Sequence, residues 1–283
     1  MESKIEGFSF LIDPIFFSLG FLEIRWYSLM YFIGFSFVLF FVLREFKKQK
    51  KGQTFLDDIE NILFWMFLFG LLGGRLGYVF FYDFSFFFLY PERIFLPFDT
   101  EGHYVGISGM SFHGGMIGAS LALLFLCWKE KISLWKISDI IVLYFPIAIF
   151  FGRIGNFLNK ELYGRQTNVP WGVDFGDGIL RHPSQLYEAF LEGVILYLVL
   201  FFSKKKIKLD GILTVIFFIS YGISRFFIEF FREPDEQLGY VFFQVLSLGQ
   251  ILSVIMVSIG FSFFFYIKRK EKTSLKLIRK KSS

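Results

Sequence analysis

The 283-residue chain is 54% hydrophobic and 22% aromatic, and its mean hydropathy is +0.55. One soluble core cannot bury 45 phenylalanines, so the composition excludes an ordinary soluble domain and predicts a polytopic membrane protein. The formal net charge is +5, and the single cysteine, Cys127, excludes an intrachain disulfide.

Apolar segments long enough to cross a membrane recur along the chain, each on the order of 20 residues. The seven segments cover 27–43, 60–82, 113–128, 138 into the polar stretch at 152–164, 185–202, 211–229 and 247–267. Two mixed segments, 1–25 and 84–112, are expected to lie at the membrane interface. The predicted fold class is all-α: a polytopic membrane protein of about seven transmembrane helices with interfacial arms. Residues 1–267 are expected to form one integral membrane domain and 268–283 a basic cytoplasmic tail.

The basic residues are divided unequally between the two sides of these segments. Of the 30 Lys and Arg residues, 20 lie at 44–53, 129–136, 203–209 and 268–281, whereas seven lie in the alternate connections and the N-terminal segment. The positive-inside rule then predicts an outside N-terminus and an inside C-terminus. The lysine runs are explained as topology signals and anchors for anionic membrane lipid, so no nucleic-acid partner is expected.

The second apolar segment carries Gly70, Gly73, Gly74 and Gly77 around Arg75. These glycines form two overlapping small-xxx-small patterns, which let two helices approach closely. The segment is therefore predicted to pack tightly against another span.

His113 stands before two glycines where the third span begins. An imidazole, with an ordinary pKa of about 6.5, suits proton transfer at neutral pH, and the glycines are expected to leave room for a ligand beside it. Tyr27 begins the first span on the same outer side, where it either lines the same pocket or belongs to an aromatic belt. His103 is expected to be solvated and His182 to help start a helix.

The most polar stretch at membrane depth is Gly152-Arg153-Ile154-Gly155-Asn156-Phe157-Leu158-Asn159-Lys160-Glu161-Leu162-Tyr163-Gly164. Charged residues near hydrocarbon are costly, and they usually face a polar cavity or a partner. A lone arginine here could simply extend to the headgroups. With Asn156, Asn159 and Glu161 beside Arg153, the stretch indicates a functional site.

A second charged group lies at the end of the sixth span. Arg225, Glu229 and Arg232 share one helical face at spacings i, i+4 and i+7. Arg153 and Arg225 in one pocket would suit an anionic headgroup, because the guanidinium is a planar fork of donors that matches phosphate. A purely structural salt-bridge network is the alternative.

Several motifs are missing from the sequence. It contains no HExxH, no paired cysteines, no P-loop, no Rossmann fingerprint and no GxSxG elbow. Neither a metal nor another cofactor is therefore expected.

The pattern Gly-Arg-x-Gly-Asn-Phe-x-Asn-x-Glu-x-x-Gly at 152–164 resembles the signature of prolipoprotein diacylglyceryl transferases at every defined position. Further blocks resemble the same family in the same order, at 26–31, 73–78, 110–115, 181–188 and 225–235. The resemblance covers the chain from about residue 12 to 267. The loop at 165–181 is shorter than in many members, which leaves the docking mode of the protein substrate open.

The resemblance implies an enzyme of the bacterial inner membrane with its active site toward the periplasm. It would transfer the diacylglyceryl group of phosphatidylglycerol to the lipobox cysteine in the signal peptide of a prolipoprotein, giving a thioether and glycerol phosphate. The implied phosphatidylglycerol-binding residues are Arg153, Asn156, Glu161 and Gly164. The implied active-site residues are His113, Tyr27, Arg225 and Glu229. His113 is our first choice for the general base, with Tyr27 or the Arg225–Glu229 pair as alternatives.

Two other classes compete with this interpretation. A transporter or channel would spread polar residues through the membrane depth, whereas here they gather near one side, and no internal repeat is evident. A membrane aspartyl peptidase would need two aspartates on one side, but Asp83 and Asp139 fall on opposite sides of the predicted topology.

Overall fold

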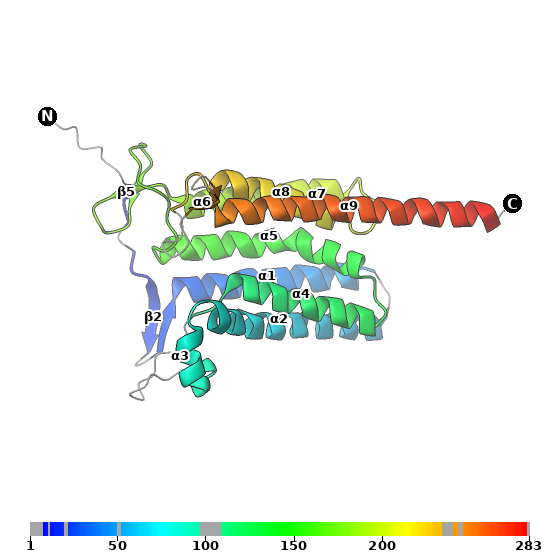
Figure 1. Ribbon diagram of the computed structural model, residues 1–283, viewed down its shortest axis with the longest axis horizontal. Helices are drawn as coiled ribbons and strands as arrows, with labels where there is room; N and C mark the ends of the chain where they lie inside the picture. The colour runs from blue at the N-terminus through cyan, green and yellow to red at the C-terminus, as the bar shows by residue number, and fades with distance from the viewer. Residues whose placement is uncertain are drawn as a thin grey trace. The chain divides into compact units, whose positions relative to one another are not determined.

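The computed structural model describes residues 8–10, 12–19, 22–49, 52–96, 109–233, 240–242 and 246–281. His103 lies outside these residues. So does Asp235, which ends the block at 225–235 that resembles the family. The long helices of Figure 1 are α1 (Trp26–Lys47), α2 (Gln53–Phe81), α4 (Phe112–Lys129), α5 (Leu134–Leu158), α8 (Ile212–Ile228) and α9 (Leu248–Lys281). A further span consists of α6 (Ser184–Glu188), the π-helical segment Ala189–Ile195 and α7 (Leu196–Lys204).

Six helical spans among the described residues are long and apolar enough to cross a membrane, and α8 is a shorter apolar helix. The predicted all-α, polytopic fold is therefore confirmed, and every predicted span coincides with a helix. The ends differ in places: α2 begins at Gln53, and α9 continues to Lys281, so the basic tail expected from residue 268 is helical in its described part.

Short strands accompany the helices. In the N-terminal segment, β2 (Ile15–Leu19) and β3 (Leu22–Arg25) form an antiparallel hairpin, where the sequence predicted only an interfacial lead-in. The other strands are β1 (Phe8–Ser9) parallel to β4 (Val173–Asp174), β4 antiparallel to β5 (Leu180–Arg181), and β6 (Tyr240–Phe242) antiparallel to β7 (Leu246–Ser247). These strands lie outside the long helices.

The chain forms two compact units: Met1–Val42 with Ser138–Ser283, here the first unit, and Leu43–Ile137, the second unit. Within the second unit, α2 packs against α4 through glycines on both helices. A Cβ built on Gly77 would lie 2.9 Å from the Cα of Gly114, and one on Gly73 would collide with the carbonyl oxygen of Gly114. The predicted close helix approach is confirmed. Gly114 and Gly115 face α2, so the room that we expected for a ligand beside His113 is used by helix packing.

Within the second unit, Arg75 of α2 binds the arm that follows this helix. The arm contains α3 (Phe84–Leu89) and the 3₁₀ helix Pro91–Ile94. The guanidinium of Arg75 donates to the carbonyl oxygens of Ile94 at 2.6 Å, Arg93 at 2.8 Å and Gly109 at 3.1 Å. A buried arginine with three backbone acceptors is thus a structural anchor.

The first unit also depends on close helix contacts. In α5, Gly155 packs on Tyr27 and Met30 of α1, and a Cβ on Gly155 would lie 3.2 Å from the Cα of Tyr27. At the other end of α5, the carboxylate of Asp139 accepts hydrogen bonds from the backbone N–H of Gly211 at 2.6 Å and of Thr214 at 2.7 Å. Asp139 therefore binds the start of α8, and α8 runs beside α9 (Figure 1).

Candidate active site

Two buried glutamates lie in the middle of the first unit. Glu188 ends α6 and Glu192 lies in the π-helical segment, and both side chains are fully buried. They are four residues apart, so they point to the same side of the helix. π-Helical turns inside α-helices are frequent at functional sites.

Arg153 of α5 and Arg225 of α8 meet these two carboxylates. The Nε of Arg153 lies 2.8 Å from one oxygen of Glu188, and the other oxygen of Glu188 accepts a hydrogen bond from Nη1 of Arg225. Each oxygen of Glu192 lies 3.8 Å from a nitrogen of one arginine. The two arginines therefore share two counter-ions, which allows both cations to lie together in a poorly hydrated place.

A third carboxylate completes the cluster on the side of α8. Glu229 lies 2.9 Å from Nη2 of Arg225, and its other oxygen accepts a hydrogen bond from Oγ of Ser247 at 3.0 Å. The phenol of Tyr221 interacts electrostatically with both arginines. Arg232 interacts electrostatically with Glu188, so it adds positive potential to the same cluster. The expected i, i+4 pairing of Arg225 with Glu229 is present.

Arg153 keeps donors that the cluster does not use. Within the described residues, its Nη1 has no ion-pair partner, and its Nη2 is only at long range from Glu192. Its side chain is 20% exposed, against 11% for Arg225 and 0% for the two glutamates between them. An unsaturated guanidinium at the more open edge of a buried ionic cluster can accept an anion.

The turn after α5 brings the other residues of the glycine-rich motif together. The Nδ2 of Asn156 donates to Glu161 at 2.8 Å, and the Nε2 of Gln185 donates to the backbone carbonyl of Glu161, also at 2.8 Å. Burial raises the pKa of the Glu161 carboxyl, and the hydrogen bond from Asn156 limits the rise. The Oδ1 of Asn156 is buried without a hydrogen-bond partner in the described part of the chain, so an acceptor is available beside the arginine.

Gly164 closes this turn under tight steric limits. A Cβ on Gly164 would lie 2.5 Å from the carbonyl oxygen of Phe231 and 2.6 Å from that of His182. Neighbouring backbone atoms therefore exclude any side chain at position 164, and the turn keeps its shape only with glycine. His182 precedes α6, as expected, and burial lowers the pKa of its imidazole.

Tyr27 lies at the same end of α5. Its backbone N–H donates to Oδ1 of Asn159 at 3.3 Å, and its ring packs on Tyr31 with centroids 4.4 Å apart. Its phenol interacts electrostatically with Glu161 and Arg153. The structure therefore brings Tyr27, Arg153 and Asn156 into one region with Glu161.

His113 belongs to the second unit. It lies in the first turn of α4, is exposed, and contacts the ring of Phe112 edge-on with centroids 5.9 Å apart. Its participation in the site of the first unit stays a prediction.

Comparison with known proteins agrees with the motif resemblance. A sequence profile of the family described as prolipoprotein diacylglyceryl transferase matches residues 14–266. The chain belongs to this family. A relative from Campylobacter hominis, named phosphatidylglycerol–prolipoprotein diacylglyceryl transferase, is 44% identical over 95% of this chain and 96% of its own length. Proteins of the same name from Pseudoalteromonas translucida and Ehrlichia canis are 43% and 40% identical, over 94% of this chain and 97% and 100% of their own lengths.

Sequence reasoning about this member of the prolipoprotein diacylglyceryl transferase family missed part of the cluster. Glu192, Tyr221 and Ser247 were not among the expected site residues, and Glu188 was noted only as the end of a resembling block. Two glutamates four residues apart in an otherwise apolar span were the available signal, because buried acids in a membrane segment need cationic partners.

Proposed function

We propose that this chain transfers the diacylglyceryl group of phosphatidylglycerol to the lipobox cysteine of prolipoproteins, the first step of lipoprotein maturation. Membership of the prolipoprotein diacylglyceryl transferase family supports the activity. The observation that carries the proposal is the buried pair Arg153 and Arg225, held by shared glutamates beside the glycine-rich turn. The N–H donors of Arg153 that the glutamates leave unused fit the oxygen atoms of a phosphodiester headgroup.

Phosphatidylglycerol would be held by the turn after α5. Arg153 offers N–H donors to the phosphate, and Asn156 and Glu161 offer acceptors to the hydroxyls of the terminal glycerol. Gly164 keeps the backbone close enough for this turn to form. Because the substrate carries two acyl chains, these groups would contact only its headgroup.

The chemical step is a displacement at carbon. The cysteine S–H gives its proton to a base, the thiolate attacks the glycerol carbon that carries the phosphate ester, a C–S bond forms and the C–O bond breaks. The bonding electrons leave with glycerol phosphate. A thiol with a pKa of about 8.5 is largely protonated at neutral pH, so the base accelerates the reaction. His113 is our first candidate for it, with Tyr27 or the Arg225–Glu229 pair as alternatives.

The arginines would act on the leaving group. Negative charge grows on the phosphate as the C–O bond breaks, and Arg153 and Arg225 would stabilise that charge. In a site with little water, fixed donors stabilise such a charge more than solvent does. The shared glutamates, Glu188 and Glu192, would position both guanidiniums before the substrate arrives.

The basic residues support a location in a bacterial inner membrane with the site facing the periplasm. The ends of α5 and α8 that carry the charged cluster are those opposite the lysine-rich connections. Residues 1–267 would then form the catalytic membrane domain, and the helical basic segment after residue 268 would lie in the cytoplasm.

The direct test is transfer of labelled diacylglycerol from phosphatidylglycerol to a lipobox peptide by the purified protein. We expect transfer that needs the peptide cysteine and falls about 100- to 1,000-fold in Arg153→Ala, the loss typical of removing a charge-stabilising donor. Arg153→Lys keeps the charge without the fork and should recover only part of the rate. Transfer to a peptide with serine in place of cysteine, or a full rate in Arg153→Ala, would contradict the proposal. A normal rate in His113→Ala would remove only that base.

A further inference from the structure

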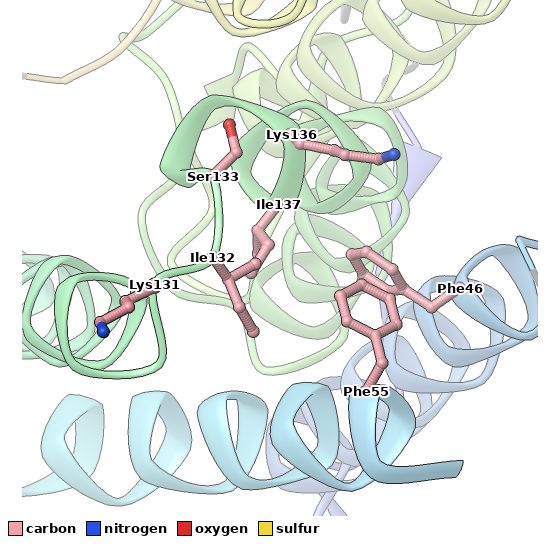
Figure 2. Close-up of a pocket in the computed structure, with 7 residues that line it drawn as sticks. All are labelled: Phe46, Phe55, Lys131, Ile132, Ser133, Lys136 and Ile137. Atoms are coloured by element: carbon pink, nitrogen blue, oxygen red, sulfur yellow. The ribbon is translucent and has the colours of Figure 1, made fainter. Parts of the chain in front are cut away.

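A cavity of about 230 Å³ lies in the second unit, and none of the residues that line it belongs to the charged cluster. It is formed where α1 ends, α2 begins and α4 connects to α5. Figure 2 shows Phe46 and Phe55 next to each other on one side of the cavity and Ile132 and Ile137 next to each other on the other. Phe46 and Ile137 are almost completely buried, so the floor of the cavity is a fixed apolar surface.

This floor is suited to hydrocarbon. A water molecule takes about 30 Å³ in the liquid, so the cavity has room for several water molecules. Its apolar walls, however, give water few hydrogen-bond partners. The three helix ends that form the cavity lie on the lysine-rich side, where the spans end and lipid headgroups begin. The cavity would therefore open toward the part of the lipid acyl chains that lies directly below the headgroups.

The rim of the cavity is positively charged. Lys131 and Lys136 extend from it on two sides in Figure 2, and neither forms a salt bridge with an acidic residue in the described part of the chain. Neighbouring lysines differ: Lys48 pairs with Glu45 at 3.2 Å and Lys129 with Glu130 at 3.4 Å. The two rim lysines thus have charge available for an external anion.

Each rim lysine lies at a position with a local cost, conformational for Lys131 and electrostatic for Lys136. Lys131 has φ of 55°, in the left-handed region that normally favours glycine, at the turn that ends α4. Lys136 lies in the first turn of α5, which contains no acidic residue and where the helix dipole favours anions. A bound anion would offset the charge cost of Lys136 and use the donor of Lys131.

We propose that this cavity binds an anionic phospholipid of the inner leaflet, with the upper part of an acyl chain on Phe46, Phe55, Ile132 and Ile137 and the phosphate on Lys131 and Lys136. The lipid is a structural ligand that joins the ends of α1, α2 and α5. Basic pockets between membrane helices on the cytoplasmic side bind anionic headgroups in this way. The inference concerns a site separate from the transfer reaction and does not depend on it.

The test is site-specific photocrosslinking in nanodiscs. The cross-linker p-benzoylphenylalanine is introduced at Phe55, and the protein is placed in nanodiscs of phosphatidylcholine with 10% of either phosphatidylglycerol or additional phosphatidylcholine of the same acyl chains. Labelled lipid is identified by mass spectrometry. We expect phosphatidylglycerol to be captured about fivefold above its share of the bilayer, as a total preference of about 1 kcal/mol would give.

Three variants separate a specific site from ordinary lipid contact. In Lys131→Gln/Lys136→Gln the enrichment of phosphatidylglycerol should fall to about its share of the bilayer, whereas Lys48→Gln/Lys129→Gln, which removes two positive charges from the same side, should keep it. Ile132→Phe should reduce capture of either lipid by filling the cavity. Capture in proportion to the bilayer composition by the unchanged protein, or equal enrichment in both double variants, would overturn the proposal. Size-exclusion profiles and the transfer assay, in which none of these residues takes part, establish that each variant is folded.

Discussion

At the scale of single residues, the charged cluster depends on how three carboxylates are shared between two arginines. Glu188 contacts both guanidiniums directly, Glu229 binds Arg225 and Ser247, and Glu192 lies at 3.8 Å from each arginine. Glu192 makes no hydrogen bond among the described residues. Its carboxyl group is therefore held close to both arginines without a direct hydrogen bond from them.

We predict that Glu192→Gln destabilises the protein although it preserves the side-chain volume. Removing one partner of a buried ionic group leaves the other charges less compensated, which costs about 3 kcal/mol. The measurement is thermal unfolding in detergent, followed by tryptophan fluorescence. Glu130→Gln is the control, because its pair with Lys129 is at the surface and should contribute less than about 1 kcal/mol. Equal unfolding temperatures for the two variants would show that Glu192 is not needed as a counter-ion.

The sequence predicted the arginines of this cluster more readily than their partners. Arg153 and Arg225 are conspicuous because they stand in or near apolar spans, and Arg225 reaches Glu229 within one helix. Glu188 and Glu192 come from a different helix, and pairing across helices depends on which faces meet. Helix periodicity alone does not determine that.

At the scale of helices, the packing of α2 on α4 was predictable from glycine spacing, and it gives a sharp mutational test. We predict that Gly73→Ala destabilises the second unit by about 1–3 kcal/mol, because the new Cβ would collide with the backbone carbonyl of Gly114 and backbone cannot move aside as a side chain can. Unfolding temperature and purified yield are the measurements.

Gly70→Ala on the same helix is the matched control. A Cβ at Gly70 would lie 3.7 Å from its nearest neighbours, an ordinary contact, and alanine favours the helix over glycine. It should be neutral or slightly stabilising. If Gly73→Ala behaved like Gly70→Ala, the two helices would not approach as closely as the structure has them.

The helices were easier to predict than the short strands or the π-helical segment. Each span is a long apolar segment. In hydrocarbon its backbone N–H and C=O groups can hydrogen-bond only to one another, which favours a helix. By contrast, the β2–β3 hairpin lies in a short mixed segment, where neither apolar length nor a turn signal decides the structure. In the π-helical segment, Gly193 lies against Phe150 of α5, a contact between helices that the local sequence does not reveal.

At the scale of the whole molecule, charge counting predicts an orientation in the membrane, and this orientation would decide on which side the chemistry occurs. The four lysine-rich segments would all face the cytoplasm, and the turn after α5, with the loop at 165–182, would face the opposite side. With this orientation, the charged cluster would have access to the periplasmic leaflet.

We predict that single cysteines report this orientation in spheroplasts. In a Cys127→Ala background, Asn168→Cys lies in an exposed part of the outer loop and Lys205→Cys in an exposed lysine-rich connection. A membrane-impermeant maleimide should label the cysteine at 168 in intact spheroplasts, and the one at 205 only after permeabilisation. Both substitutions lie on exposed residues outside the cluster, so transfer activity should be kept and shows that the labelled protein is native. Labelling of position 205 in intact spheroplasts, with position 168 protected, would reverse the topology and place the charged cluster in the cytoplasmic leaflet, where exported prolipoproteins are out of reach.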